Sequence, residues 1–449
     1  LPLPFISLKQ GLELTHEAGT PFTDPGATVK DLDGKVLKDD LAGEGTVDST
    51  TLGEYTLTYN FTDGNGNAAE PATLRVIVVD SSAPTIKLKP DANGDTETVR
   101  VVVGQPYEDP GLTATDIVDK EVHVWNSLQI PTSGLTAYYR LDEITGLVAH
   151  DDWSGHHGTL HGMTDDNHVD GKNGKALDFN GVKADAQHMV APPFIIGGDF
   201  TFAAWVNYDK FNNWSRIIDF GNAANNHNVL VANRGGGSQI AWEVRIGGNN
   251  RNILHPNFWE LNKWMHVVAT VSKDGVLRVY KNGDQAAENL AGHAPQDMKR
   301  TGQYIGRSHW ANDGFFDGQM DDLLFYRRVL SQEEIKLLAN GESSVINTSE
   351  PATHTITYVA SDDSGNIAKI KRTIIVEPDP ASPVITLNGE EFFYLEGGTD
   401  FTDPGATAKD TTGKLLEEGI LSKDTFDTKT PGKYVLSYVY VTPDGKAAV

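Results

Sequence analysis

The segment Phe22-Thr-Asp-Pro-Gly-Ala-Thr-Val-Lys-Asp31 decides the fold, because the chain repeats it twice. It returns as Tyr107-Glu-Asp-Pro-Gly-Leu-Thr-Ala-Thr-Asp116 and again as Phe401-Thr-Asp-Pro-Gly-Ala-Thr-Ala-Lys-Asp410. Repeats of this kind mark structural units that recur along one chain. The sequence therefore predicts three similar modules.

A second repeated segment is a strand with apolar or aromatic residues at every second position, as in residues 53–62. This alternation is typical of a strand with one buried face. A turn rich in Asp, Gly and Asn follows the strand, as in Asp63-Gly-Asn-Gly-Asn67 and Asp362-Asp-Ser-Gly-Asn366. Asx turns account for these acidic residues without a metal ion, although calcium is the alternative for Asp63, Asp362 and Asp363.

The spacing of the two signatures indicates an insertion. In the first and third copies the residue that opens the first signature and the tyrosine of the strand lie 37 residues apart. In the middle copy the corresponding residues, Tyr107 and Tyr358, lie 251 residues apart, which leaves 214 extra residues. That is the size of a domain, and insertions are tolerated in loops whose ends lie close together.

Composition excludes several classes of protein. The 449 residues carry a formal net charge of -25, whereas nucleic-acid backbones and anionic membranes require clustered cations. No apolar run approaches the length of about 18 residues that a membrane helix needs. The absence of cysteine excludes thiol catalysis, Cys-ligated zinc and disulfides. The acidity suits a soluble exported protein that meets neutral glycans or divalent cations.

The insert, about residues 135–341, differs from the rest in composition. It holds seven of the 8 Trp and 11 of the 14 His, with strand signals separated by Gly/Asn turns. One helix is predicted, because Ser331-Gln-Glu-Glu334 forms a capping box and Gly341 can end it. The insert is otherwise predicted to be a β-sandwich.

The repeated modules resemble bacterial Ig-like repeats, on the strength of the Asp-Pro-Gly segment and the tyrosine strand with its turn. The insert resembles the laminin-G-like, concanavalin A-like jelly-roll family. The matching segments are Gly134–Leu141, Asp152–Gly155, Gly174–Gly181, Phe200–Val206, Ser215–Gly221, Trp264–Val268, Tyr304–Trp310 and Gly318–Tyr326. The resemblance implies carbohydrate recognition, frequently with bound Ca²⁺, although a fold does not fix a function.

We therefore predict an all-β protein of three Ig-like sandwiches with a jelly-roll sandwich inserted in the second. Module 1 is residues 1–80, module 2 is residues 81–133 plus 343–379, the guest domain is residues 134–342, and module 3 is residues 380–449. Module 3 lacks a counterpart of the last strand of module 1, residues 74–79, so we expect further domains of a longer protein to follow.

Matching the family's motif places a calcium site on Asp152, Asp321 and Asp322, with carbonyl oxygens from Gly155 and His157. Ca²⁺ takes six to eight oxygen ligands, and the first and last strands of a jelly roll are neighbours. Neighbouring residues of a strand point to opposite faces, so at most one of Asp321 and Asp322 should reach the ion. The alternative is that these carboxylates cap loops. We expect Ca²⁺ to raise the melting temperature of the guest domain.

Sugar recognition needs an aromatic surface that stacks on a pyranose ring, with polar groups that bond its hydroxyls. Trp205 and Trp264 alternate with apolar residues and are predicted to lie in the core, whereas Trp214 and Trp310 lie in polar loops. The predicted ligand-binding residues are Trp214, Arg216, Asn226, His227, Arg234, Arg307, His309 and Trp310. The alternative for each tryptophan is that it only covers a loop.

No catalytic residues are predicted. Catalytic relatives of this fold place paired carboxylates on one strand, and no such pattern occurs; Glu243 stands alone and Asp321 and Asp322 point apart. Zinc at His156, His157 and His161 is disfavoured, because neighbouring residues diverge on a strand and no HExxH pattern is present.

The predicted function is a non-catalytic polysaccharide-binding and spacer segment of a larger secreted or cell-surface bacterial protein. Its expected partner is a polysaccharide or cell-surface glycan, with Ca²⁺ as cofactor, no nucleic acid, no membrane insertion and a monomeric state. The alternatives are a structural or adhesive stalk that binds a protein partner, and a glycan-degrading enzyme with an unrecognised acid pair.

Overall fold

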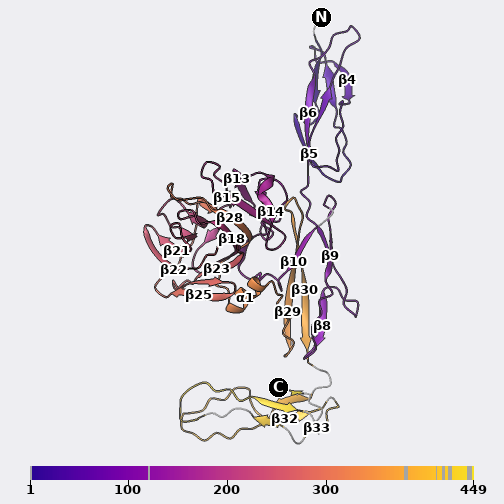
Figure 1. Ribbon diagram of the computed structural model, residues 1–449. Helices are drawn as coiled ribbons and strands as arrows, with labels where there is room; N and C mark the ends of the chain where they lie inside the picture. Colours follow the sequence, from indigo (N-terminus) through magenta and orange to yellow (C-terminus); the bar gives the residue numbers. More distant parts are fainter. Residues whose placement is uncertain are drawn as a thin grey trace. The chain divides into compact units, whose positions relative to one another are not determined.

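The computed structural model describes residues 3–119, 122–378, 383–410, 412–416, 420–422, 427–441 and 447–448. Strands dominate these residues, with one α-helix and one short 3-10 helix among them (Figure 1). The described helices include none with the length and apolar character of a membrane span. By internal contacts the chain divides into two units: residues 1–89, 110–344 and 356–371, and residues 90–109, 345–355 and 372–449.

Module 1 is a small β-sandwich of two three-stranded sheets. One sheet has the order β1-β3-β4 (Phe5–Leu8, Ala27–Lys30, Val36–Leu41), and the other has the order β2-β6-β5 (Glu13–Glu17, Ala72–Val79, Gly53–Tyr59). The last strand, β6, lies in the middle of its sheet, parallel to β2 and antiparallel to β5. Alternating residues of β6 and β5 are buried, which confirms the predicted period of two.

The repeated motif has a structural role. Asp24 accepts hydrogen bonds from the backbone N–H of Gly26 at 2.8 Å and of Gly43 at 2.7 Å, and from the Tyr59 hydroxyl at 2.5 Å. Gly26 has φ +74°, in the left-handed region that favours glycine. The two repeated segments therefore meet at one carboxylate. In module 3 the Tyr438 hydroxyl likewise donates to Asp403, which also accepts from the Gly405 N–H at 2.7 Å.

Replacing Asp24 by alanine should destabilise module 1, because it leaves one hydroxyl and two N–H groups without their acceptor. Hydrogen bonds to charged groups contribute about 1.5–3 kcal/mol each, and we expect a loss of about 2 kcal/mol for this partly exposed site. Hydrogen exchange of residues 20–60 in the full chain would measure it as faster exchange. Asp33→Ala, which removes an exposed carboxylate from a turn in the same module, is the control; equal protection in both variants would contradict the role of Asp24.

Module 2 is assembled from both sides of the insertion. In the first unit, β7 (Thr85–Leu88) pairs with β9 (Leu112–Thr115), and β10 (His123–Asn126) pairs with residues 358–361 of β29 (Ala352–Ser361). In the second unit, β8 (Thr98–Val102) is parallel to residues 373–377 of β30 (Ile367–Glu377). The pairing of β10 with β29 shows that the insertion interrupts one module.

The guest domain is a sandwich of two large sheets. The first has the order β14-β15-β28-β18-β23-β24-β25, with β11 also paired to β28. These strands are β11 (Leu135–Tyr139), β14 (His168–Asp170), β15 (Lys175–Asn180), β18 (Phe200–Lys210), β23 (Met265–Val271), β24 (Leu277–Lys281), β25 (Asp284–Asn289) and β28 (Asp317–Tyr326).

The second sheet has the order β12-β13-β16-β27-β19-β20-β21-β22. These strands are β12 (Val148–Ala149), β13 (Gly158–His161), β16 (His188–Val190), β19 (Arg216–Gly221), β20 (Val229–Asn233), β21 (Ile240–Ile246), β22 (Asn249–His255) and β27 (Gly302–Ile305). A short pair, β17 (Ile195–Ile196) and β26 (Met298–Lys299), and the 3-10 helix Asp165–Asn167 complete the domain.

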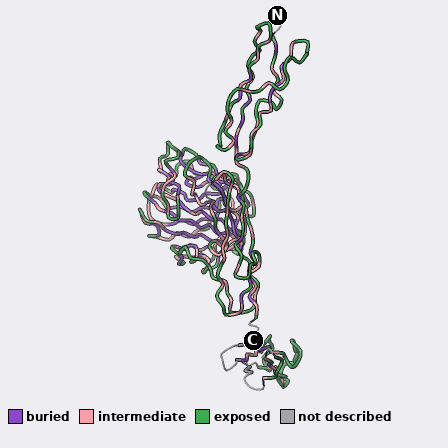
Figure 2. The backbone as a smooth tube through the Cα atoms, turned by 90° about the vertical axis from the view of Figure 1, so that its right-hand side faces the viewer, coloured by how far each residue is buried: buried purple, intermediate pink, exposed green. Residues whose placement is uncertain are grey.

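The core of the guest domain lies between the two sheets, where buried residues are concentrated (Figure 2). Phe202, Trp242 and Phe325 are buried there. Trp205 of the first sheet is less completely buried, with 9% of its surface exposed. Trp264, in contrast, is only partly buried, because it precedes β23 instead of lying within it.

The one described α-helix, α1 (Gln332–Asn340), begins and ends as predicted. The Ser331 side chain accepts from the Glu334 N–H, the Glu334 side chain accepts from the Ser331 N–H at 2.8 Å, and Gly341 ends the helix at φ +67°. Ile335 and Leu338 are buried in a second apolar cluster with Trp125 of β10 and Val359 of β29. This cluster packs the guest domain onto the strands that carry it.

Module 3 has strands β31 (Val384–Leu387), β32 (Ala406–Lys409), β33 (Leu415–Leu416), β34 (Ile420–Ser422), β35 (Tyr438–Val441) and β36 (Ala447–Ala448). They form two three-stranded sheets, β31-β32-β33 and β34-β35-β36. The first corresponds strand by strand to the sheet β1-β3-β4 of module 1.

Candidate functional site

The loop that carries the predicted calcium ligands is organised by Asp151. Its Oδ1 accepts from the backbone N–H of Tyr138 at 2.8 Å and of Trp153 at 3.0 Å. Its Oδ2 accepts from the Ser154 hydroxyl at 2.6 Å and the His156 N–H at 2.9 Å. Asp151 is fully buried, so these bonds satisfy a carboxylate that water cannot reach. The sequence motif predicted Asp152, one residue further on, as the metal ligand of this loop.

Asp152 and Asp322 both lie beside Arg140. The Arg140 guanidinium forms an ion pair with Asp142, and its Nη1 lies 3.8 Å from Asp152 Oδ2. Burial alone would lower the pKa of Arg140. The neighbouring Tyr138, Asp142, Asp152 and Asp322 have the larger, opposite effect, so the pKa is raised. A cation of the chain itself therefore stands among the carboxylates.

Asp322 sits at an irregular point of β28. Its φ is +51°, and the register with β18 shifts where Asp321 pairs with Trp205, so the regular alternation of faces is broken there. Asp322 accepts from the Tyr138 hydroxyl at 2.6 Å and the Asn173 side-chain amide at 2.7 Å. Asp321 Oδ2 accepts from the backbone N–H of Lys172 and Asn173, while its buried Oδ1 has no hydrogen-bond partner.

The loop residues predicted to offer carbonyl oxygens lie in the same turn. Gly155 has φ +74°, and the His157 Nδ1 accepts from the Asp151 N–H at 3.1 Å. The carbonyl of His156, which lies between them, accepts a hydrogen bond from the hydroxyl of the buried Tyr139 at 2.6 Å. His161 stacks on His188 with ring centroids 4.8 Å apart, away from this turn.

These residues do not fit a calcium ion as they stand. Ca²⁺ requires several free oxygens around one point, whereas the oxygens of Asp151 and Asp322 accept protein hydrogen bonds and Arg140 supplies the positive charge. Calcium at this position remains a prediction from the family resemblance. It would need Arg140 to leave the carboxylates.

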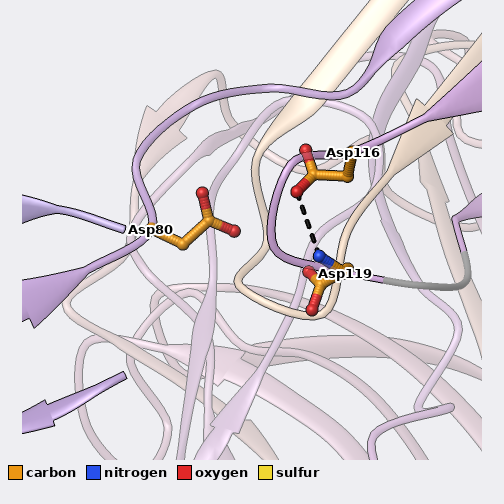
Figure 3. Close-up of side chains that lie close together, drawn as sticks. All are labelled: Asp80, Asp116 and Asp119. Carbon is orange, nitrogen blue, oxygen red and sulfur yellow. Dashed lines mark hydrogen bonds between the residues drawn. The ribbon is translucent and has the colours of Figure 1, made fainter. Parts of the chain in front are cut away.

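A different acidic group lies in the first unit. The carboxylates of Asp80, Asp116 and Asp119 each offer an oxygen, and these oxygens lie within 4.8 Å of one another (Figure 3). Asp116 Oδ1 accepts from the Asp119 N–H at 3.1 Å and the Val118 N–H at 2.7 Å, and Asp119 accepts from the Asp363 N–H at 3.0 Å. A turn explains Asp116 without an ion, and Asp119 is engaged by the N–H of the distant Asp363.

The predicted Asx turns are present. Asp63 accepts from the backbone N–H of Asn65 and Asn67, and Asp362 accepts from the N–H and side chain of Asn366. Asp362 is buried, and burial raises its pKa to about 6. These acidic turns therefore close loops.

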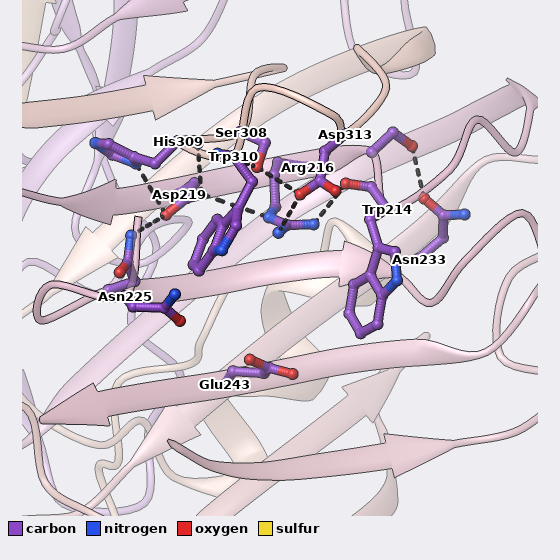
Figure 4. A network of polar contacts seen from close by, with 12 residues as sticks. Trp214, Arg216, Asp219, Asn225, Asn233, Glu243, Ser308, His309, Trp310 and Asp313 are labelled. Atoms are coloured by element: carbon purple, nitrogen blue, oxygen red, sulfur yellow. Dashed lines mark hydrogen bonds and ion pairs between the residues drawn. The ribbon is translucent and has the colours of Figure 1, made fainter. Parts of the chain in front are cut away.

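The most developed polar cluster lies on the second sheet, on the face opposite to the core. Arg216 begins β19 and lies between the rings of Trp214, at 5.5 Å, and Trp310, at 5.2 Å (Figure 4). Its Nη2 donates to Asp313 at 2.8 Å. Arg216 is only 3% exposed, so in this conformation it holds the two indoles and offers little surface to a ligand.

Both tryptophans are partly exposed and are held from several sides. Trp214 has φ +52°, and its backbone N–H donates to the Gly235 carbonyl at 2.8 Å. The Trp310 ring also stacks on Arg245, at 5.2 Å, and its backbone N–H donates to Ser308. In the described part of the structure, neither indole N–H has a hydrogen-bond partner, so each remains available as a donor.

The other predicted binding residues surround this cluster at different distances. His309 joins it directly, with Nδ1 3.1 Å from Asp219, and its ring lies 4.5 Å from Tyr304. Arg307 lies over the Tyr304 ring, at 4.7 Å, and its Nη1 donates to His188 Nε2 at 3.2 Å. Arg234 lies in the β20–β21 turn beside Trp214, whereas Asn226 and His227 lie in the β19–β20 turn at the opposite end of these strands.

Two carboxylates on this face were not predicted as site residues. Asp219 of β19 and Glu243 of β21 both pair in register with Leu230, so their backbones lie about 10 Å apart, two strand spacings. Asp219 accepts from Asn228 at 2.8 Å, and Glu243 pairs with Arg245 at 2.8 Å. A charged residue within an apolar strand, as in Ala241-Trp-Glu-Val244, is the signal that could have found Glu243.

Comparison with protein families agrees with this architecture. Residues 180–336 match the model described as the concanavalin A-like lectin/glucanases superfamily, and residues 6–79 and 385–449 match the Ig-like domain of bacterial surface proteins. The chain thus combines a concanavalin A-like domain with bacterial-surface Ig-like domains, which confirms both resemblances. No curated protein is similar enough to count as a match.

Among solved structures, domain 4 of an extracellular arabinanase from Geobacillus stearothermophilus, in complex with arabinotriose, is 21% identical with a TM-score of 0.38. The match covers 46% of this chain and 98% of that one. A Trypanosoma rangeli sialidase in complex with an inhibitor is 20% identical with a TM-score of 0.36, over 47% of this chain and 33% of that one. Likenesses this low carry no argument about function.

We expect Ca²⁺ or EDTA to leave the melting temperature of the guest domain unchanged, because Arg140, which pairs with Asp142 and lies 3.8 Å from Asp152, stands among the carboxylates where the ion would bind. Replacing Arg140 by methionine should lower the stability by about 3–5 kcal/mol, the usual cost of leaving buried charges unpaired. Calorimetry of the full chain measures both. A rise of several degrees on adding Ca²⁺ that disappears in Asp152→Asn would instead establish the calcium site that the family resemblance implies.

The guest domain should be most stable near pH 6. Burial raises the pKa of Glu143 to about 7, of Asp152 to about 6 and of Asp321 to about 8, so acidification from pH 8 protonates the folded state first and stabilises it. Burial lowers the pKa of His150 and of His188 to about 4 and that of His266 to about 3, so below about pH 6.5 the unfolded chain gains protons that the folded one does not.

Thermal melts between pH 8 and pH 4.5 would measure this maximum. His266→Gln should weaken the fall on the acid side, since it removes one buried imidazole. A melting temperature that declines steadily from pH 8 downwards would contradict the roles given to the buried carboxyl groups.

Proposed function

We propose that the guest domain binds a neutral carbohydrate on the outer face of its second sheet, and that the Ig-like modules present it outside a bacterial cell. The binding surface consists of Trp214 and Trp310 with the polar groups of the neighbouring turns. The family matches support carbohydrate binding and a location at the cell surface, since one family contains lectins and the other contains bacterial surface proteins.

The proposal rests on the contacts between arginine side chains and the indole rings of Trp214 and Trp310. Arg216 lies between them and Arg245 also contacts the Trp310 ring, at 5.2 Å, so both rings are held while they stay partly exposed. A sugar ring stacks on an aromatic face, and a ring that is already ordered loses less conformational entropy when it binds. A tryptophan that only covered a loop would not need this support.

The net charge of -25 favours a neutral ligand over a polyanion. The arginines near the indoles do not reverse this, because Arg216 is paired with Asp313 and Arg245 with Glu243. We therefore expect uncharged polysaccharides to be the ligand class.

Replacing Trp214 or Trp310 by alanine should weaken binding to a neutral polysaccharide about tenfold each, which corresponds to about 1.4 kcal/mol of stacking energy per ring. Affinity electrophoresis or calorimetry against a panel of arabinan, xylan, mannan and β-glucan would measure it. Trp264→Ala is the matched control, since Trp264 is also partly exposed but precedes β23 in the other sheet. Binding that survives the double variant Trp214→Ala/Trp310→Ala would remove the proposal.

The presence of two carboxylates, Asp219 and Glu243, on one face of the second sheet is the observation behind a second candidate, a glycoside hydrolase. Inverting glycosidases use two carboxyl groups about 6.5–9.5 Å apart. Both carboxylates are engaged in hydrogen bonds and ion pairs, so a substrate would have to displace Asn228 and Arg245. Release of reducing sugar by the chain, lost in both Asp219→Asn and Glu243→Gln, would establish this candidate; binding without release favours the first.

A further inference from the structure

In modules 1 and 2 an early strand and the last strand lie side by side and run in the same direction. In module 1, β2 is parallel to β6 over five residue pairs, from Glu13 opposite Arg75 to Glu17 opposite Val79. In the second unit, β8 is parallel to residues 373–377 of β30, again over five residue pairs. Each of these modules therefore joins its entering chain to its leaving chain by a parallel pair.

The direction of a strand pair decides how it responds when the chain is pulled along its length. In a parallel pair, the N-terminal end of the early strand and the C-terminal end of the last strand lie at opposite ends of the pair. Tension then slides the two strands past each other and acts on all of their hydrogen bonds together. In an antiparallel pair these two ends lie next to each other, so the hydrogen bonds break one after another.

The guest domain is attached through antiparallel pairs. β10 and β29 have His123 opposite Ser361, which are the two ends at which tension would enter and leave. Within the guest domain, β11 and β28 have Leu135 opposite Tyr326, again at the ends that face the host along the chain. Tension that reached these pairs would therefore open them one residue pair at a time.

Glu17 extends the parallel pair of module 1 beyond its last residues. Its carboxylate accepts from the Ser81 backbone N–H at 3.0 Å, and from the hydroxyls of Ser81 and Ser82 at 2.5 and 2.6 Å. These hydrogen bonds, above all that of the Ser81 hydroxyl, lower the pKa of Glu17, so its charge is kept at neutral pH. The chain that leaves β6 is thus tied to β2 at the point where tension would act.

The order of the strand pairs along the chain separates the guest domain from tension. β8 precedes the guest domain and residues 373–377 follow it, so the β8–β30 pair closes a loop that contains β10, the guest domain and β29. While this pair holds, tension applied before β8 and after β30 passes directly from one strand to the other. The loop between them carries none of it.

We propose that the parallel pairs are the tension-bearing elements of modules 1 and 2, and that the β8–β30 pair keeps the guest domain out of the path of tension. The two modules then transmit force along the chain while the guest domain stays folded. Forced unfolding is governed by the unfolding rate, which is low when all hydrogen bonds of a pair have to break in one event. The inference is independent of carbohydrate binding.

Single-molecule pulling of the full chain tests the direction of the strands. The chain has no cysteine, so two introduced cysteines define the points at which force acts. Gln10→Cys with Ala83→Cys slides β2 along β6, whereas Leu52→Cys with Ala83→Cys peels β5 from β6, where Gly53 lies opposite Val78. We expect the first arrangement to need at least about twice the unfolding force of the second. Equal forces would overturn the proposal.

Glu17→Ala tests the exit end of the pair. It should lower the unfolding force between Gln10→Cys and Ala83→Cys, because the leaving chain is no longer tied to β2. Glu54→Ala is the matched control, since Glu54 is also exposed and pairs with Arg75 from the β5 side, which leaves β2 untouched. An equal loss of force in both variants would contradict the transfer of tension through β2 and β6.

A second set of attachment points tests the protection of the guest domain. Ala92→Cys with Pro378→Cys acts on the β8–β30 pair, whereas Ser133→Cys with Glu342→Cys pulls on the ends of the guest domain directly; all four positions are exposed. We expect the guest domain to unfold at a force at least about twofold lower when it is pulled by its own ends. Unfolding of the guest domain at the same force from both sets of points would overturn the protective role of β8 and β30.

Discussion

The pairing of β10 with β29 is the constraint on which the rest of the structure depends. It joins His123–Asn126 to Tyr358–Ser361 across the whole guest domain. Closing a flexible loop of about 230 residues instead of about 15 costs only about 2.4 kcal/mol more, because the entropy of closure grows with the logarithm of the length. A folded guest domain lowers that cost further, since its two ends are already close.

The ends of the guest domain are fixed on the host module by packing as well as by hydrogen bonds. The Arg328 side chain of the guest domain donates to the Ser133 carbonyl of module 2 at 2.6 Å, and the Lys369 side chain of module 2 donates to the Trp153 carbonyl of the guest domain. Trp125 of β10 packs edge-on against Tyr138, with ring centroids 5.5 Å apart. Host and guest therefore share a core, which a flexible linker would not provide.

The sequence predicted the architecture because its signals are local or repeated. In modules 1 and 3 the carboxylate of the Asp-Pro-Gly segment holds a left-handed glycine and a distant tyrosine, so the segment and its tyrosine recur there at the same spacing. The capping box at Ser331 and the alternation in β5 and β6 also depend on neighbouring residues only. Such features can be read without knowing the tertiary contacts.

The site was harder to predict, because its geometry depends on contacts between distant residues. Nothing around Arg140 in the sequence shows that it lies among Asp142, Asp152 and Asp322. The bulge at Asp322 breaks the alternation on which the argument about Asp321 and Asp322 rested. Arg216 was expected to face a ligand and is buried between two indoles, because the loops of Trp214 and Trp310 fold over the start of β19.

The insertion also sets an order of folding during synthesis on the ribosome. Strand β29, the partner of β10, is translated about 225 residues after β10, which takes roughly 10–45 s at 5–20 residues per second. The guest domain is complete before β29 emerges, so it can fold while the first half of its host waits. The nascent strand β10 therefore stays without its partner for longer than β5 of module 1, and an unpaired strand edge is prone to aggregation.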